Sequence, residues 1–478
     1  TIDVAYRYFT TDKRSFIVAD TPGHEEYTRN MAVGASFADL AIILVDAKQG
    51  VLVQTKRHAR ICSLMGIKYF VFAVNKMDLV GYSKERFDEI TAQIDELSKE
   101  LGLASVKIIP VSATEGDNIT KKSDNTPWYD GEALLTYLEN VDVSQKKQEE
   151  GFYMPVQRVC RPDHTFRGFQ GQIESGVVSV GDEITTLPSG ETANVKSILI
   201  GDKDSQSAQA EQPVTIQLDK EVDVSRGCVL EKDTDIKVSS SITATLLWMD
   251  DDILENGKNY FVKLGTKMIP GIVTEIVHTV DVNTGEEKKA DKLSKNEIAL
   301  CTISLADKIV VDEFKNHKTL GELILIDRVT NMTSACGVVE KVNEGGEGLF
   351  AGRVDRNVRA ALNGQKAVAI AFPVERQGVS RSLLEKVEKE LSIQGKHTYL
   401  YAPGSEENIS DVIKHLHHAG VITLLLVEEK YASTVRIASE EYYHVLPEDI
   451  KVETDEIVKY IDELSAYDVR VAGNGEFI

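Results

Sequence analysis

Five consecutive residues have the types needed to bind the phosphate end of a ligand: Asp20, Thr21, Pro22, Gly23 and His24. They follow the apolar run 16–19, which we predict to be a buried strand, and α/β sheets bind ligands at the carboxyl ends of such strands. An Asp at this point can hold Mg²⁺ through water, and a Gly lets its backbone N–H approach a terminal phosphate. Because other strand-to-helix turns look similar, this loop alone is a weak signal.

A second polar loop has the residue types needed to recognise a base. Asn75-Lys76-Met77-Asp78 follows the apolar run 70–74. A carboxylate that accepts from two adjacent ring N–H groups recognises guanine and leaves adenine unsatisfied, at a cost of about a few kcal/mol. The spacing of this loop from the first predicts a guanine-nucleotide site.

The third loop is Ser112-Ala113-Thr114, which follows the predicted strand 106–111. It is suited to offering a backbone N–H to the guanine carbonyl. Three such loops at the same edge of one sheet are hard to obtain by chance, so the three motifs support each other.

The elements that must position these loops follow from the hydrophobic pattern. Short apolar runs alternate with helix-period segments, the βαβ rhythm of a parallel sheet covered on both faces. We predict strands over 15–20, 40–47, 69–76 and 106–111, and helices that include 55–66 and 83–102. This pattern is typical of an α/β nucleotide-binding fold.

The pattern changes twice further along the chain, which at 478 residues is long enough for about three or four domains. Regular short strands with Gly, Asn and Asp turns predict two β-barrels that meet near Lys237, a Gly/Glu-rich stretch follows, and helices and strands then alternate again. We predict an α/β domain over 1–147, β-barrels over 151–237 and 238–342, a linker over 343–365 and an α/β domain over 366–478.

The three loops resemble those of the translational-factor GTPases, the relatives of elongation factor Tu. The resemblance implies GTP and Mg²⁺ as cofactors, with Asp20 in the Mg²⁺ shell, Gly23 at the γ-phosphate and His24 orienting the attacking water. Thr21 and Pro22 complete that loop. Thr1 looks like the switch threonine that closes on Mg²⁺ in this class.

The same resemblance implies the roles of the base-binding residues. Asn75 and Asp78 would contact guanine, Lys76 would pack over the nucleotide, and Ser112 and Ala113 would meet the guanine carbonyl. Each residue also has a plainer interpretation outside its motif: His24 could be a helix-start residue, Asp78 a cap and Ser112 a turn residue.

Longer sequence segments resemble one branch of this class, the large GTP-hydrolysing subunits of bacterial sulfate adenylyltransferase. They are Thr1–Phe9, Glu26–Met31, Arg161–Asp163 with Phe166–Phe169, Leu264–Thr266, and Ile324–Arg328 with Thr330–Asn331. The resemblance implies a P-loop-type GTPase domain and two β-barrels. It also implies a separate small catalytic subunit, which makes adenylyl sulfate (APS) and diphosphate from ATP and sulfate while GTP hydrolysis drives the reaction. Arg161 and Arg167 could touch that partner or be solvated loop residues.

Residues 366–478 resemble an APS kinase in layout, because some members of the family carry such a domain. A phosphate loop needs Gly, four residues, then Gly-Lys-Ser/Thr after the first strand. Here the stretch reads Pro373-Val-Glu-Arg-Gln-Gly378-Val379-Ser380, and the acidic turn expected after the second strand is replaced by Ala402-Pro403-Gly404. We therefore predict a kinase-like domain without kinase activity.

Composition limits the classes of function. Lys and Arg number 54 against 76 Asp and Glu, so the net charge of −22 makes nucleic-acid and membrane binding unfavourable. The cysteines lie singly along the chain, which predicts a reducing cytoplasm. The chain starts at Thr1, within an apparent structural element, so we expect an upstream segment that carries the first strand, the phosphate loop with its lysine and the Mg²⁺ hydroxyl.

Three alternatives stay open at this stage. The chain could be a translation-type GTPase that delivers RNA, a bifunctional protein whose C-terminal kinase makes PAPS, or a scaffold in which both α/β domains are inactive. His415 and His418 share one face of the predicted helix 406–419 and could bind a metal, although a solvated helix end is the simpler interpretation.

Overall fold

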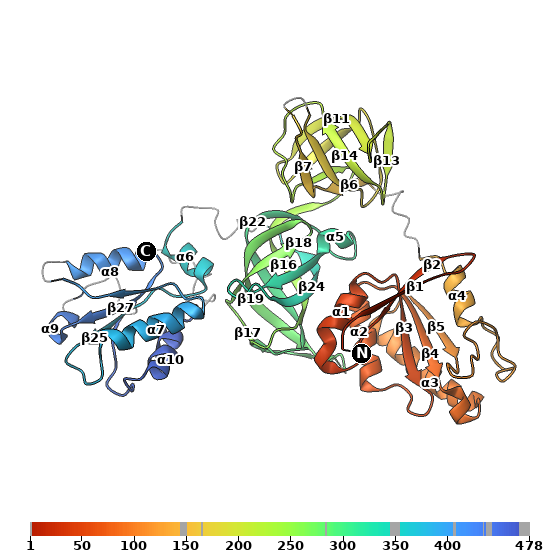
Figure 1. The fold of residues 1–478 in the computed structure, drawn as a ribbon, viewed down its shortest axis with the longest axis horizontal. Coiled ribbons are helices and arrows are strands. Elements are labelled where there is room, and N and C mark those ends of the chain that lie inside the picture. Colours follow the sequence, from red (N-terminus) through yellow and green to blue (C-terminus); the bar gives the residue numbers. More distant parts are fainter. Residues whose placement is uncertain are drawn as a thin grey trace.

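The computed structural model describes residues 2–143, 151–163, 166–282, 284–344, 354–404, 408–433, 435 and 442–467. These residues form two α/β domains and two β-barrels (Figure 1). The second barrel lies at the centre, the α/β domains lie at opposite ends, and the first barrel lies beside the second (Figure 1). Thr1 and the tail 468–478 lie outside the described residues.

The N-terminal domain, residues 2–143, is built on a parallel sheet of order β3-β4-β5. Its strands are β3 (Leu40–Asp46), β4 (Tyr69–Asn75) and β5 (Ser105–Pro110). Its α-helices are α1 (Thr28–Ser36), α2 (Val53–Leu64), α3 (Lys84–Leu101) and α4 (Leu134–Asn140). The strands predicted over 40–47, 69–76 and 106–111 and the helices predicted over 55–66 and 83–102 are confirmed, with their ends shifted by one or two residues.

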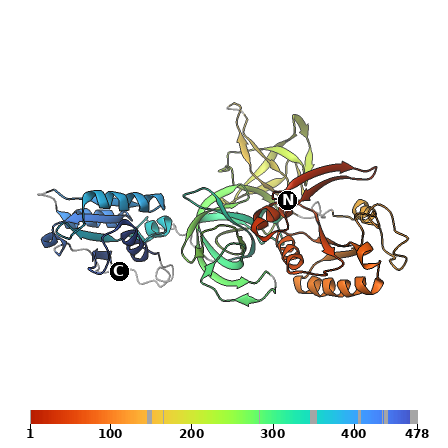
Figure 2. The ribbon, with the colours of Figure 1, turned by 60° about the horizontal axis from the view of Figure 1, so that its bottom comes forward.

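One strand is placed differently from the prediction. The segment 15–20 forms a strand, β2 (Ser15–Asp20), but it pairs antiparallel with β1 (Ala5–Thr10) in a separate sheet. Figure 2 shows this hairpin as a long projection. The prediction that 16–19 is a buried strand is wrong, because Ile17 is 68% exposed. The turn bond from Thr11 N to Arg14 O explains the pairing, because it folds β2 back on β1.

The two barrels are antiparallel. The first contains β6 (Phe152–Pro155), β7 (Arg158–Cys160), β8 (Gly168–Gln172), β9 (Val177–Ser179), β10 (Glu183–Leu187), β11 (Glu191–Ile200), β12 (Lys203–Ser205), β13 (Ser207–Gln209), β14 (Pro213–Leu218) and β15 (Val229–Lys232). The second contains β16 (Lys237–Trp248), β17 (Leu254–Glu255), β18 (Asn259–Leu264), β19 (Lys267–Val280), β20 (Glu287–Lys288), β21 (Lys292–Leu293), β22 (Ile298–Val311), α5 (Lys318–Gly321), β23 (Glu322–Ile326) and β24 (Thr333–Val342). Inward side chains alternate with outward ones, as in β14, and fill each barrel.

The C-terminal domain, residues 354–467, has a parallel sheet of order β26-β27-β25-β28. Its elements are α6 (Arg356–Asn363), β25 (Ala369–Pro373), α7 (Arg381–Ile393), β26 (Thr398–Tyr401), α8 (Ile409–His418), β27 (Ile422–Val427), α9 (Glu429–Ala432), β28 (Tyr443–Val445) and α10 (Thr454–Leu464). Apolar side chains of β25, β27, α7 and α10 form its core.

The segment predicted as a linker over 343–365 contains a helix. Helix α6 begins where the Asp355 side chain accepts a hydrogen bond from Val358 N, and it ends at Gly364, whose left-handed conformation (φ 60°) suits a helix C-terminus. Residues 345–353 of the same segment lie outside the described part of the chain.

The hydrophobic core of the N-terminal domain extends into the second barrel. Leu247, Met249, Val282 and Ile298 of the barrel belong to the same buried cluster as the apolar side chains of α1, α2, α3, β3 and β4. None of the helices that the structure describes combines the length and apolar character needed to cross a bilayer.

Candidate functional site

The predicted base-binding residues meet at the carboxyl ends of β4 and β5. The Asn75 side-chain oxygen Oδ1 accepts hydrogen bonds from Lys76 N at 2.8 Å and from Ala113 N at 3.0 Å. The Ser112 hydroxyl donates to Asp78 Oδ1 at 2.7 Å. Ser112 is completely buried, so its hydroxyl holds the Asp78 carboxylate from the protein interior. The two loops therefore form one preorganised unit.

Lys76 adopts a conformation that is unusual for a residue with a Cβ. Its φ is 67°, in the left-handed region. Its ammonium donates to Asp46 Oδ2 at 2.7 Å, where Asp46 ends β3. The neighbouring ammonium holds the pKa of the Asp46 carboxyl below its usual range. Sequence reasoning missed Asp46, although it stands at a strand end just as Asn75 does.

A second carboxylate orders the loop after Ser112. Asp117 accepts from the Tyr82 hydroxyl at 2.6 Å and from the Ser123 hydroxyl at 2.6 Å. These bonds lower the pKa of the Asp117 carboxyl, and the carboxylate raises the pKa of Tyr82 to about 12. Neither Asp117 nor Tyr82 was predicted, because their pairing depends on a loop contact that no local sequence pattern records.

The predicted phosphate-end loop lies against α2. The carbonyl oxygen of Gly23 is 3.2 Å from His58 Nε2. Burial lowers the pKa of His58, so the imidazole is neutral near pH 7 and donates its Nε2 proton to that carbonyl. Arg57 forms an ion pair with Glu25 at 3.1 Å, just after the loop. Helix α2 thus holds both ends of the His24 turn.

His24 begins a short 3₁₀ segment, Glu25–Tyr27. Its Nδ1 accepts from Glu26 N at 3.3 Å, and its side chain is 65% exposed. The imidazole is therefore oriented by its own backbone and accessible to solvent, as a group that positions a water molecule must be.

The rest of this loop packs closely against α1. A Cβ at Gly34 would lie 2.4 Å from Thr21 Cγ2, so the helix can approach the loop only because residue 34 is a glycine. Pro22 is buried and Asp20 is exposed. Thr1, the predicted switch threonine, lies outside the described residues.

Helix α1 connects this loop to the second barrel. Arg29 donates to the carbonyl oxygens of Met249 at 2.9 Å and Thr333 at 3.1 Å. From the barrel side, Lys318 donates to the carbonyl oxygen of Ser36 at 3.0 Å, near the end of the same helix. A displacement of the phosphate-end loop would therefore act on the barrel through α1.

The loop after β25 in the C-terminal domain is filled by its own side chains. The Arg376 guanidinium donates to four carbonyl oxygens, those of Leu446, Pro447, Glu448 and Ile450. The Glu375 carboxylate accepts from Glu429 N at 2.9 Å, and Ser380 caps α7 by accepting from Leu383 N at 3.2 Å. One backbone donor at the start of each of α7 and α9 therefore already has a hydroxyl or carboxylate partner.

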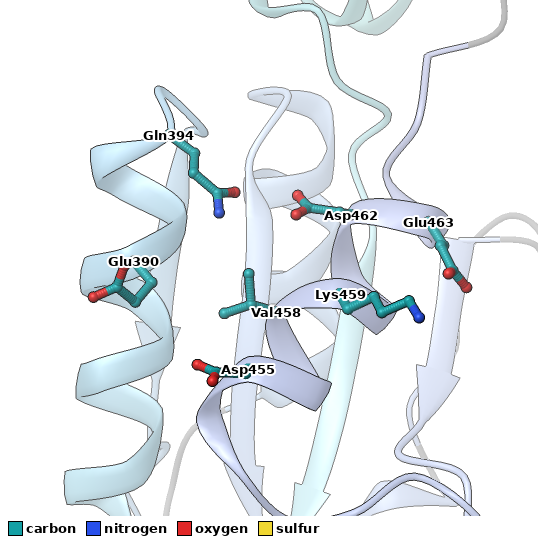
Figure 3. Close-up of a pocket in the computed structure, with 7 residues that line it drawn as sticks. All are labelled: Glu390, Gln394, Asp455, Val458, Lys459, Asp462 and Glu463. Carbon is teal, nitrogen blue, oxygen red and sulfur yellow. The ribbon is translucent and has the colours of Figure 1, made fainter. Parts of the chain in front are cut away.

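A cavity of about 370 Å³ lies between α7 and α10 of the same domain. Figure 3 shows its lining: Glu390, Gln394, Asp455, Val458, Lys459, Asp462 and Glu463. The lining carries four carboxylates against one ammonium, so its charge disfavours a phosphorylated ligand.

The helix-end histidines differ in burial. His415 and His418 are exposed, whereas His417 is buried and accepts from Arg356 Nη1 at 2.9 Å. Burial lowers the pKa of His417 to about 4. Within the described part of the chain, no group of three or more His, Cys, Asp or Glu side chains could hold a metal ion.

The two arginines considered as partner contacts both pair with Glu221. Arg161 lies 2.8 Å and Arg167 2.5 Å from its carboxylate oxygens. Arg167 also donates to the carbonyl oxygens of Val222 and Val224, so it braces the first barrel. Arg161 has a half-exposed side chain.

Comparison with known proteins gives matches in two regions and along most of the length. The family described as elongation factor Tu GTP binding domain matches residues 1–157, and the family described as GTP-eEF1A C-terminal domain-like matches residues 241–340. Sulfate adenylyltransferase subunit 1 of Saccharophagus degradans is 48% identical over 345 residues, which cover 72% of this chain and 73% of the relative.

Two further relatives extend the comparison. Sulfate adenylyltransferase subunit 1 of Teredinibacter turnerae is 48% identical over 339 residues, or 71% of this chain and 72% of the relative. The bifunctional enzyme NodQ of Rhizobium meliloti is 42% identical over 403 residues, or 84% of this chain and 63% of the relative. Because the alignment with NodQ covers 84% of this chain, it must extend past residue 366, whichever residue it starts from.

Proposed function

Because the chain belongs to the family of sulfate adenylyltransferase subunit 1, the GTPase of sulfate activation, we propose that it couples GTP hydrolysis to APS formation by a partner subunit. The partner makes APS and diphosphate from ATP and sulfate. The observation that carries the proposal is the bonded unit of Asn75, Asp78, Ser112 and Ala113. It holds a carboxylate, a side-chain amide, a buried hydroxyl and a backbone amide together at one sheet edge, and a carboxylate so placed can accept from the two adjacent donors of guanine.

At the phosphate end, we assign the hydrolytic roles to the loop that begins at Asp20. His24 orients the attacking water, and its oriented, exposed imidazole supports this role. Gly23 offers its N–H to the γ-phosphate. Asp20 and Thr1 hold Mg²⁺, Asp20 through water, since hard cations prefer oxygen ligands of this kind. The ion neutralises charge on the phosphates when bound.

Coupling is needed because a sulfate–phosphate anhydride forms uphill. A loop whose conformation depends on the γ-phosphate can supply the energy if its movement reaches the partner. The bonds from Arg29 on α1 to the second barrel support such a route. We place the partner, a small catalytic subunit, in the cytoplasm with this chain, whose cysteines are all unpaired.

We assign a kinase-like but inactive role to the C-terminal domain. Arg376 and Glu375 support this assignment, because these two side chains of the loop after β25 are committed to backbone groups after β28 and at the start of α9. Val379 stands where the lysine of a phosphate loop is needed. PAPS formation from APS and ATP by the full-length protein would contradict this part of the proposal.

The central experiment measures sulfate-dependent diphosphate release from ATP by the partner subunit with the full-length chain. GTP should stimulate release, and a GTP analogue that cannot be hydrolysed should not. The change His24→Ala should lower the GTP hydrolysis rate by about a hundred-fold, within the range that positioned proton-transfer groups contribute, and should abolish stimulation.

His415→Ala is the matched control, since it removes another exposed histidine, on α8 of the C-terminal domain. It should leave both rates unchanged. If the unaltered protein hydrolyses GTP but gives no stimulation of diphosphate release, the coupling proposal fails. If His24→Ala hydrolyses GTP at the normal rate, the assignment of His24 fails instead.

A further inference from the structure

Asp46 ends β3, and the side chain of Lys76 connects it to the guanine-binding unit, which is the bonded set of Asn75, Asp78, Ser112 and Ala113. Residues Asp46 and Asn75 are direct partners in the parallel pairing of β3 and β4, and Ala47 N donates to Asn75 O at 2.8 Å. The two strand ends are therefore fixed relative to each other. Lys76, which follows Asn75, crosses from β4 to β3 and reaches Asp46.

The two carboxylate oxygens of Asp46 have different partners. Oδ1 accepts from Lys48 N at 2.8 Å and so closes the turn after β3. Oδ2 accepts from the Lys76 ammonium at 2.7 Å. Asp46 is thus held by its own turn and presents its second oxygen as a fixed anchor for the lysine.

Lys76 needs such an anchor because its backbone is sterically disfavoured. A left-handed φ of 67° is uncommon for a residue with a Cβ and persists only where surrounding contacts enforce it. Two contacts do so here: Lys76 N donates to Asn75 Oδ1, and Lys76 Nζ donates to Asp46. The left-handed turn directs the lysine towards β3 while Asp78 reaches Ser112.

We propose that Asp46 is a positioning residue of the guanine-nucleotide site, which acts by holding Lys76 in this left-handed conformation. The inference rests on the proposed function and assigns to Asp46 a role in binding the base. Asp46 acts through Lys76 and not on the phosphates, so it affects ground-state and transition-state binding equally. Its loss should weaken nucleotide binding and leave turnover at saturating GTP unchanged.

The test is the affinity of the full-length protein for GDP, with Asp46→Asn as the variant. The amide oxygen can still accept from Lys48 N, but the amide no longer attracts the Lys76 ammonium. We expect the affinity for GDP to fall about five-fold, as the loss of a partly exposed ion pair allows. The kcat for GTP should stay the same, and the thermal midpoint without nucleotide should fall only slightly, because the pair is partly exposed.

A second background separates positioning from a merely structural role. Lys76→Met keeps the side-chain stem and removes the ammonium, so adding Asp46→Asn to it should cause no further loss of affinity. Asp88→Asn is the matched control, because it breaks a comparable exposed pair, Lys84–Asp88 at 2.6 Å on α3, and should not change GDP binding.

Each result points to one conclusion. If Asp46→Asn binds GDP as tightly as the unaltered protein, or if it weakens binding equally in the Lys76→Met background, the positioning role is refuted while the proposed function stands. If the unaltered protein binds no guanine nucleotide, the proposed function and the role of Asp46 are refuted together.

Discussion

At the scale of single residues, Asp78 is the group that we propose selects the base. Guanine offers two adjacent donors, its ring N1–H and its 2-amino group, to a carboxylate. Ser112 donates to Asp78 Oδ1 and so fixes the plane in which that carboxylate meets them. On this proposal, selectivity for guanine comes from one acceptor group held by a buried hydroxyl.

Replacing Asp78 by Asn should exchange the preferred base. The amide presents an N–H in place of one oxygen, which suits the 2-carbonyl of xanthine and repels the 2-amino group of guanine. We expect Asp78→Asn to lower the affinity for GTP by about a hundred-fold or more and to favour XTP over GTP. Competition binding of the two nucleotides measures this, and the exposed Asp124 provides an Asp→Asn control. A variant that still prefers GTP would contradict guanine contact by Asp78.

The sequence predicts the base-binding residues because each follows an apolar strand, and parallel strands bring their carboxyl ends to one edge. It does not reveal their supports. The Ser112–Asp78 bond joins residues 34 positions apart, and the His58–Gly23 contact joins residues 35 positions apart. Such pairs depend on how loops and helices pack, which no local pattern encodes. Asp46 is the exception, because the strand-end rule that identified Asn75 applies to it as well.

At the scale of elements, α6 joins two domains by both of its ends. Arg356, in its first turn, donates to His417 of α8, and its guanidinium lies 4.4 Å from the centre of the Tyr442 ring. At the other end, Asn259 and Arg328 of the second barrel both donate to the carbonyl oxygen of Leu362. The barrel thereby caps a helix of the C-terminal domain.

This cap should control how often α6 opens. Removing one hydrogen bond costs about 1 kcal/mol, or about five-fold in a local opening equilibrium. We expect Asn259→Ala to speed hydrogen exchange of the α6 amides about five-fold. Asn140→Ala removes a comparable side-chain bond to Thr136 O within α4 and should leave α6 unchanged. Unchanged exchange of α6 in Asn259→Ala would show that the barrel does not hold it.

Helix α6 also shows that amino-acid composition alone does not predict where a linker ends. The Gly/Glu-rich residues 343–348 favour a linker, and the prediction extends that linker to residue 365. The local signals for a helix were nevertheless present, with Asp355 as the N-cap and Gly364 after the last turn. Strand β2 shows the opposite difficulty. Its apolar pattern correctly predicts a strand, but its partner is set by the turn at Thr11, which folds it back on β1.

At the scale of the molecule, buried hydrophobic clusters cross the boundaries between domains. Each barrel and the C-terminal domain have cores of their own, and a small buried cluster of Tyr153, Val229, Val310 and Leu320 joins the two barrels. The core of the N-terminal domain also extends into the second barrel, which contributes Met249 and Val282 to it. Arg29 and Lys318 add hydrogen bonds across the same contact. We therefore expect these two domains to unfold as one cooperative unit.

A cavity in that shared core tests this expectation. Met249 lies in the second barrel, far along the chain from the guanine-binding unit, yet Met249→Ala should lower the transition temperature of the unit that binds guanine nucleotide. Truncation of a buried Met costs about 2–5 kcal/mol, which corresponds to roughly 5 °C or more in a unit of this size. Calorimetry identifies the unit, because GDP raises the transition of whatever it binds.

Met154→Ala provides the matched control, since Met154 is fully buried in the core of the first barrel. It should lower a transition that GDP does not raise directly. If Met249→Ala leaves the GDP-sensitive transition in place, the second barrel folds independently of the N-terminal domain. The bonds from Arg29 to Met249 and Thr333 would then join two separate units. If the GDP-sensitive transition falls, the nucleotide-binding domain and the second barrel belong to one folding unit. A change at the phosphates then alters the stability of the barrel as well.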